Sequence, residues 1–230
     1  MTIAVLVPAL NRPGNAGPLV RSLRENTRSD YRCLFICSPG DTAEHDAADA
    51  AGAEVLVVDW QPGYGDFARK INHGYTVTKE PWVFQAADDL RFHPGWDTEA
   101  IAIAERLNAG VVGTQDLGNA QVRRGQHSTH TLFARRYLDE QGGTIDNTGS
   151  VFCELYRHQF VDNEAVETAK LRGEFAFARR STVEHLHPLW RKAEMDDTYR
   201  KALADFDHDR ALFMQRMRMI RTRLARRRNR

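Results

Sequence analysis

The chain has 230 residues, enough for one sizeable hydrophobic core. Its 42% hydrophobic and 27% charged residues are ordinary for a globular protein. No apolar run approaches the ~18 residues of a membrane span, which argues against an integral membrane protein. The net charge is +1, but residues 211–230 hold eight arginines and no acid, so residues 1–210 carry 24 basic and 31 acidic groups, a net charge of −7. The sequence thus predicts an acidic body with a basic tail.

The N-terminal run "MTIAVLVPALNRPG" lacks a basic leading region and a small-residue cleavage site. We therefore expect a core strand there instead of a secretion signal, and a cytoplasmic protein. The three cysteines form neither an even disulfide set nor a paired zinc pattern, so packing is their expected role.

Strand-like and helix-like segments alternate through the first ~115 residues. A strand at 3–10 is followed by a helix that we expect Pro18 to open. Later segments repeat the alternation: strands at 31–38, 54–60, 81–88 and 109–114, and helices at 42–53, 64–77 and 95–108. Such a βαβ series predicts an α/β fold of Rossmann-like type, with a mostly parallel sheet flanked by helices.

Two adjacent carboxylates, Asp88 and Asp89, stand at the end of the strand predicted at 81–88. In open parallel sheets, ligands bind at the carboxyl ends of strands. Neighbouring carboxylates repel each other unless a cation or hydrogen-bond donors neutralise them, and hard oxygen ligands suit Mg²⁺ or Mn²⁺. The alternative is that one aspartate caps the turn before Pro94 and the other is solvated.

Five ordered segments carry a family resemblance: "VLVPALNRP", "ICSPGDT", "YGDFARKINHGY", "VFQAADDLRFHPGW" and "VDNEAVETAKLRGEFAFARRSTVEHLHPLW". Together they resemble the family 2 nucleotide-sugar glycosyltransferases of the GT-A fold, and are most similar to the small members encoded by bacteriophages of actinobacteria. The resemblance implies a GT-A domain at 1–192, with a nucleotide-sugar-binding half at 1–115 and an acceptor half at 116–192. Residues 193–230 are expected to form a C-terminal helical extension.

The resemblance implies donor-binding roles in three segments. The turn after the first strand corresponds to the family's base-binding turn, where Arg12 could meet a phosphate. Asp41 either reads the base or ribose or caps the following helix. Cations on the helix at 64–77 would lie beside the diphosphate, unless they belong to a solvated face. The full set of expected nucleotide-sugar-binding residues is Pro8, Ala9, Leu10, Asn11, Arg12, Asp41, Arg69, Lys70, Asn72 and Asp88.

The metal motif departs from the family's D-x-D pattern, because Ala87 stands in place of the first acid. By resemblance, Asp89 inherits the metal role and Asp88 the ribose role, with Mn²⁺ or Mg²⁺ as cofactor. A histidine after the last core strand completes the metal shell in relatives. His187 is our first candidate and His185 the second; on an extended stretch their side chains would point to opposite sides. Two structural histidines are the alternative.

An inverting transfer needs a base that deprotonates the acceptor. "FVDNEAV" resembles the family's E-D segment, so Asp162 is the first candidate base and Glu164 the second. A surface helix cap is the alternative interpretation of this segment.

The arginine tail leaves several functions open. Apolar residues at roughly helical spacing predict an amphipathic helix over 211–225 that ends in "RRRNR". Such a tail could be a solvated end, or could bind DNA or an anionic membrane.

A hydroxymethylated base in phage DNA is one hypothesis for the acceptor; a protein, glycan or lipid is the alternative. Two other functions compete with a transferase: a degenerate binding module ranks second, and a nucleotidyltransferase ranks third. The sequence indicates neither sugar, base nor oligomeric state.

Overall fold

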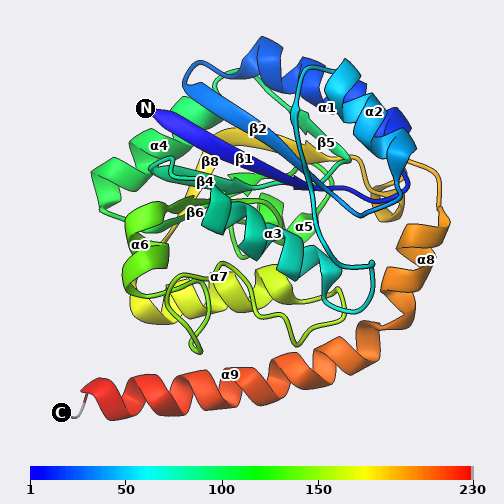
Figure 1. Ribbon diagram of the computed structural model, residues 1–230. Helices are drawn as coiled ribbons and strands as arrows, with labels where there is room; N and C mark the ends of the chain where they lie inside the picture. Colours follow the sequence, from blue (N-terminus) through cyan, green and yellow to red (C-terminus); the bar gives the residue numbers. More distant parts are fainter. Residues whose placement is uncertain (229–230) are drawn as a thin grey trace.

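The computed structural model describes residues 1–228, with side chains as far as residue 225. Within that range an eight-stranded sheet has the order β3-β2-β1-β4-β7-β6-β8-β5. Helices cover both faces of the sheet, and the long helix α9 runs beneath α7 (Figure 1). The strands are β1 (Thr2–Pro8), β2 (Asp30–Cys37), β3 (Glu54–Val57), β4 (Trp82–Gln85), β5 (Leu90–Phe92), β6 (Val111–Gln115), β7 (Thr131–Ala134) and β8 (Phe175–His185).

The helices follow the strands closely in the first half of the chain and gather at its end. They are α1 (Pro13–Asn26), α2 (Thr42–Ala50), α3 (Asp66–Val77), α4 (Trp96–Leu107), α5 (Ala120–Arg123), α6 (Arg135–Glu140), α7 (Val161–Arg172), α8 (Asp197–Ala204) and α9 (Phe206–Arg228), with a short 3₁₀ turn, η1 (Pro188–Trp190). No helix in the described part of the chain is long and apolar enough to cross a membrane.

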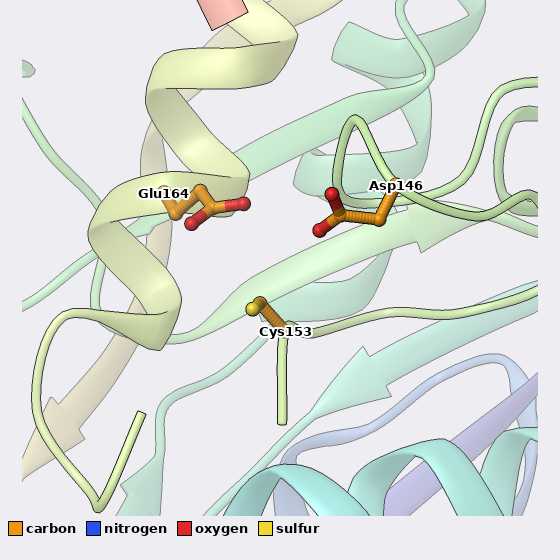
Figure 2. A group of neighbouring side chains, drawn as sticks. All are labelled: Asp146, Cys153 and Glu164. Atoms are coloured by element: carbon orange, nitrogen blue, oxygen red, sulfur yellow. The ribbon is translucent and has the colours of Figure 1, made fainter. Parts of the chain in front are cut away.

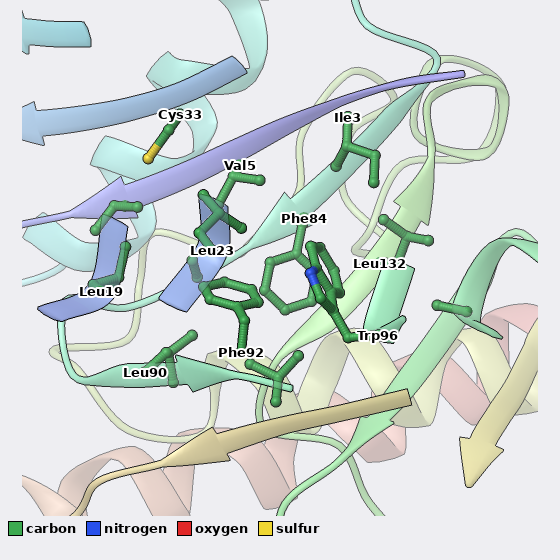
Figure 3. Packing of buried hydrophobic residues seen from close by; sticks show 14 of the residues in the cluster. Ile3, Val5, Leu19, Leu23, Cys33, Phe84, Leu90, Phe92, Trp96 and Leu132 are labelled. Atoms are coloured by element: carbon green, nitrogen blue, oxygen red, sulfur yellow. The ribbon is translucent and has the colours of Figure 1, made fainter. Parts of the chain in front are cut away.

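Strand β1 shows why the sheet carries helices on both faces. Its alternate side chains enter two different cores: Ile3 and Val5 pack with α1 and α4, whereas Ala4 and Leu6 pack on the side of α3 and α7. Figure 3 shows the first core, where Phe84, Phe92 and Trp96 meet beside Leu23. The Phe84 and Trp96 ring centroids lie 4.6 Å apart. A strand buried on both faces must be apolar, as β1 is from its second residue, Ile3, to Pro8.

The α/β fold expected from the sequence, with a mostly parallel sheet flanked by helices, is confirmed, with two differences in detail. Helix α1 begins at Pro13, not Pro18, because Pro13 occupies the first turn, where its missing N–H costs nothing. The sheet is mixed: β7 lies between β4 and β6 and runs antiparallel to both, and β5 is antiparallel to β8. The remaining strands run in one direction, so their carboxyl ends share an edge.

Helix α9 forms where the sequence predicts a helix, and one of its faces is partly buried. Met217 and Ile220 are buried, and Leu212 and Phe213 pack against the core on the side of α7. Asp209 fixes the start of the helix, since its carboxylate accepts hydrogen bonds from the main-chain N–H groups of residues 157–159 at 2.8–3.0 Å. The predicted terminal run at 226–230 lies outside the residues whose side chains the structure describes.

Candidate active site

The turn after β1 stands at the carboxyl edge of the sheet. Asn11 has φ 56°, a left-handed conformation that asparagine tolerates better than most residues. Its main-chain N–H donates to Asp41 Oδ2 at 2.7 Å, and the N–H of Arg12 donates to Glu44 Oε2 at 2.7 Å. Asp41 makes no side-chain cap on α2, so its carboxylate serves this turn instead. Two acids at the start of α2 therefore hold the turn that carries Arg12.

Lys70 of α3 also stabilises this turn. It is fully buried, and its Nζ donates to the Ala9 carbonyl at 2.9 Å and to Ser38 Oγ at 2.8 Å, and pairs with Asp66 at 2.9 Å. Pro8, Ala9 and Leu10 lead into the turn, and the Ala9 N–H donates to the Ile36 carbonyl. Because every proton donor of this ammonium is directed inward, Lys70 supports the turn and is not on a solvated face.

The other two residues of α3 proposed from the sequence face different neighbours. The Arg69 guanidinium lies over the ring of Trp60, 4.5 Å from its centroid. The side chain of Asn72 is hydrogen-bonded to the segment at 151–154. Its Oδ1 accepts from the N–H groups of Val151 and Phe152, both at 2.9 Å. Asn72 thus ties α3 to the 151–154 segment.

Asp88 and Asp89 lie just beyond the end of β4, at this same edge, and both are buried. Arg12 Nη1 lies 3.3 Å from Asp88 Oδ1 and 3.6 Å from Asp89 Oδ2. Burial, reinforced by the Asp89 charge, raises the pKa of Asp88. Burial alone would also raise the pKa of Asp89, but His185 and the Tyr199 hydroxyl lower it overall. Asp89 is therefore the carboxylate that keeps its charge.

The two oxygens of Asp89 differ in their hydrogen bonds: one has two partners, and the other has none among the described residues. Oδ2 accepts from His185 Nε2 at 3.2 Å and from the hydroxyl of Tyr199. Oδ1 is buried and has no hydrogen-bond partner among the described residues. A buried carboxylate oxygen without a donor is costly, so it marks a place where a cation or another ligand fits.

His187 lies beside His185, and their ring centroids are 4.8 Å apart. The expectation that the two histidines point to opposite sides is wrong, because β8 ends at His185 and His187 caps η1. His187 Nδ1 accepts from the Leu189 N–H at 3.1 Å, so Nε2 is the ring nitrogen that this bond does not use. Burial and the charge of His185 lower the pKa of His187 to about 4, so its imidazole is neutral near pH 7. The carboxylate oxygens of Asp88 and Asp89 are of the kind that suits Mn²⁺ or Mg²⁺.

Asp162 begins α7 and meets the loop at 124–130. Its Oδ2 lies 3.1 Å from His127 Nε2, and its Oδ1 accepts from the Asn163 N–H at 2.9 Å. Burial would raise the pKa of Asp162, but the hydrogen bond with His127 lowers it overall. The carboxylate is therefore charged and held in one orientation.

Glu164, the second candidate base, is fully buried and paired. Arg216 of α9 donates to it through Nε at 2.6 Å and through Nη2 at 2.8 Å, and Tyr156 adds its hydroxyl at 2.7 Å. Asp146 and Cys153 lie beside it, and the potential ligand atoms of the three fall within 4.8 Å of one another (Figure 2). Arg216 also pairs with Asp146, so a guanidinium already supplies the positive charge that a metal would bring.

Several residues of this region had no local signal in the sequence. Glu44 is buried and its Oε1 lacks a partner among the described residues. Asp196 accepts from Arg12 through both oxygens, and Tyr199 reaches Asp89 across 110 residues. His130 is buried with its Nε2 unpaired among the described side chains. The pattern "MDDTYRKA" indicates a helix start, but nothing in it indicates which side chains the helix brings to the site.

The family model "Glycosyl transferase family 2" matches residues 4–164. The chain belongs to this family. The match includes Arg12, Asp88, Asp89 and Asp162, whereas the two histidines and α8 lie beyond it. No curated protein matches the chain.

Solved structures show the same fold at low identity. A mannosyltransferase from Pyrobaculum calidifontis, in complex with GDP-Man and Mn²⁺, is 13% identical with a TM-score of 0.64, over 80% of this chain and 56% of that one. S. aureus TarS 1–349 is 12% identical with a TM-score of 0.60, over 80% of this chain and 60% of that one. Glucosyl-3-phosphoglycerate synthase from Mycobacterium tuberculosis, with Mn²⁺, UDP and phosphoglyceric acid, is 17% identical with a TM-score of 0.54, over 76% of this chain and 66% of that one. The chain spans about 60% of the length of the solved structures that it matches.

Proposed function

We propose that the edge around Asp89 is the donor site of a metal-dependent glycosyltransferase, which moves a sugar from a nucleotide diphosphate sugar to an acceptor. The observation that carries the proposal is the bare Oδ1 of Asp89, buried beside Asp88, Arg12 and His185 at the carboxyl edge of the sheet. Family membership supports the reaction, and the structural neighbours in complex with Mn²⁺ and nucleotides support the cofactor and donor class.

The site's own residues supply binding and charge. Asp89, with His187 and His185 as further candidates, would hold Mn²⁺ or Mg²⁺, and this ion would neutralise the leaving diphosphate. Arg12 offers N–H groups that can pair with phosphate oxygens in a bidentate manner. The acids Asp41 and Glu44 lie where the nucleoside is expected, beside the turn at Asn11. Lys70 supports that turn through its hydrogen bond to the Ala9 carbonyl.

Asp162 is the proposed base. A base must lie within hydrogen-bond reach of the acceptor hydroxyl and be free to accept its proton. Asp162 is a charged carboxylate at the start of α7, held by His127. Glu164 is a weaker candidate, since both of its oxygens accept from Arg216. Inversion at the anomeric carbon is part of the proposal and follows from the family.

The experiment that tests the donor site is titration calorimetry against UDP-, GDP- and TDP-sugars, with and without Mn²⁺. We expect one donor to bind in a metal-dependent way, and Asp89→Ala to abolish this binding. Asp49→Ala is the matched control, because Asp49 is an exposed acid on α2. Absence of binding by every donor would overturn the proposal. Donor binding without transfer to any acceptor, unchanged in Asp162→Asn, would instead favour a catalytically degenerate binding module.

For the acceptor we propose a hydroxymethylated base in phage DNA, with a protein, glycan or lipid as the alternatives. Support comes from α9, on which Arg210, Arg218, Arg221 and Arg223 are exposed. The test replaces Arg218, Arg221 and Arg223 by glutamine and leaves the buried Arg216 in place. We expect weaker DNA binding and a log–log salt slope that is smaller by about 0.9 for each phosphate that is no longer neutralised. DNA binding that is unchanged in the triple variant would contradict a DNA acceptor held by α9.

A further inference from the structure

The start of α8 lies across the proposed donor site. Tyr199 is buried there, and its hydroxyl donates to Asp89 Oδ2, the same oxygen that faces His185. Its ring packs against His187, with centroids 4.6 Å apart. A cation held by both oxygens of this carboxylate needs a lone pair of Oδ2 as well as Oδ1, and the tyrosine proton already occupies one lone pair of Oδ2.

Arg12 is engaged by the same segment. Asp196 accepts from Arg12 Nε at 2.8 Å and from Nη2 at 3.0 Å, and the guanidinium lies 4.0 Å from the centroid of the Tyr199 ring. A carboxylate bound in this fork geometry occupies the two N–H groups that would otherwise pair with two phosphate oxygens. Asp196 is thus placed as an internal substitute for a phosphate group.

We propose that residues 196–199 are an internal occupant of the donor site, which the metal and the nucleoside diphosphate must displace in order to bind. The inference rests on the proposed function. It assigns Tyr199 as the competitor of the cation at Asp89 and Asp196 as the competitor of the diphosphate at Arg12.

Few other contacts hold residues 196–199; at the far end of α8, Gln159 Nε2 donates to the Ala202 carbonyl at 3.4 Å, and Arg157 pairs with Asp205 at 2.8 Å. Within α8 only Tyr199 and Ala202 are buried, while Asp197, Arg200 and Lys201 are exposed. The Asp196 side chain is itself 43% exposed, although it binds a buried arginine. A segment with few buried apolar contacts can open locally at small cost, so the bonds to Asp89 and Arg12 are the main ones that keep residues 196–199 in the site.

A different role for Tyr199 predicts the opposite effect on metal binding. If the hydroxyl oriented Asp89 as a ligand, its loss would weaken metal binding, as the loss of outer-shell hydrogen bonds generally does. If the hydroxyl competes with the cation, its loss strengthens binding. The direction of the change therefore separates an occupant from a positioning residue.

The first test measures Mn²⁺ binding alone, by electron paramagnetic resonance, in the full chain. We expect Tyr199→Phe to bind Mn²⁺ on the order of tenfold more tightly than the wild type, because one charge-assisted hydrogen bond no longer competes. Tyr64→Phe, at an exposed tyrosine, should bind as the wild type does. Unchanged or weaker binding in Tyr199→Phe would overturn the inference. If the wild type and Asp89→Ala bind Mn²⁺ equally, the proposed function fails instead.

The second test uses UDP and GDP with Mn²⁺ and a matched pair of variants. Asp196→Asn keeps an N-cap for α8 and removes the negative charge that pairs with Arg12. Asp197→Asn removes the same charge one residue later, where the partner is the exposed Arg200. We expect Asp196→Asn to bind the preferred nucleotide about fivefold more tightly and Asp197→Asn to be unchanged. Equal affinities in the two variants would count against the inference.

Hydrogen exchange gives a readout that does not depend on affinity. We expect the amides of α8 to lose protection when Mn²⁺ and the bound nucleotide are added, since the segment must leave the site. A gain of protection there would mean that α8 closes over the donor, and would overturn the proposal.

Discussion

Two clusters in this fold contain the same groups, two carboxylates and an arginine, and differ in how fully they are satisfied. Beneath α9, Arg216 pairs with Glu164 and Asp146, and both Glu164 oxygens have donors. At the sheet edge, Arg12 lies beside Asp88 and Asp89, and Asp89 Oδ1 has no partner in the described chain. Composition alone does not separate a structural cluster from a binding site. The oxygen of Asp89 that has no partner among the described residues is the reason for proposing a binding site at the sheet edge.

The largest effect is expected in the satisfied cluster. Arg216→Leu leaves Glu164 charged, buried and without its cation, which should lower the free energy of unfolding by about 3–5 kcal/mol in urea titrations. Arg218→Ala, on the exposed face of the same helix, should stay within about 0.5 kcal/mol of the wild type. If both variants are equally stable, the Arg216 cluster does not stabilise the fold.

Removing a charge from the sheet-edge cluster should raise the free energy of unfolding instead of lowering it. The pKa of Asp88 is raised in the fold, so the folded state holds this proton more tightly than the unfolded state does. Stability from this group is thus lost as pH rises above the unfolded value of about 4. Asp88→Asn should therefore raise the free energy of unfolding at pH 8 by about 1–2 kcal/mol in metal-free buffer. A destabilised Asp88→Asn protein would show that the carboxylate is satisfied after all.

The buried His130 should make the free energy of unfolding depend on pH. Burial and the charge of His185 lower its pKa to about 3, so the unfolded state binds a proton below pH 6.5 that the folded state does not. Stability should consequently fall as pH decreases, by about 1 kcal/mol between pH 6 and pH 5. His130→Gln should flatten this slope in denaturation curves measured at several pH values. An unchanged slope would assign the acid sensitivity to other groups.

The smallest effect is expected at Asp146. Its side chain is 32% exposed, and Arg216 would still pair with Glu164 after Asp146→Asn. The loss in unfolding free energy should stay below about 1 kcal/mol. Chelators should not change the wild-type midpoint through this cluster, because Arg216 supplies its positive charge. A chelator-induced loss that Asp146→Asn removes would point to a metal bound there.

The sequence predicted the fold well where its signal is local. Alternating strands and helices indicated the GT-A type, and a buried run ending before Asp88 placed the carboxylates at the sheet edge. The antiparallel β7 was not foreseen, because pairing partners are chosen across the chain and periodicity carries no partner information. The roles of Asp89, the histidines and Asp162 stay predictions.

Long-range contacts account for what was missed in the site. Arg12 and Asp196 are 184 residues apart, and Tyr199 lies beyond the segment that the family model matches. The bonds of Lys70 to the Ala9 carbonyl and to Ser38 were not foreseen, since helix spacing cannot tell which of two flanks is covered by another loop. Its place near the diphosphate stays a prediction.

Both ends of the α8 segment are anchored: β8 and η1 precede it, and Asp209 fastens α9 after it. A displaced segment therefore stays tethered, and its return is an intramolecular reaction with an effective concentration in the millimolar range. The donor would then compete with a partner that never diffuses away, and its apparent affinity would be reduced by the fraction of chains in which the segment is open. Shortening or loosening this tether would tune the donor concentration at which the protein responds, without altering a single atom that touches the donor.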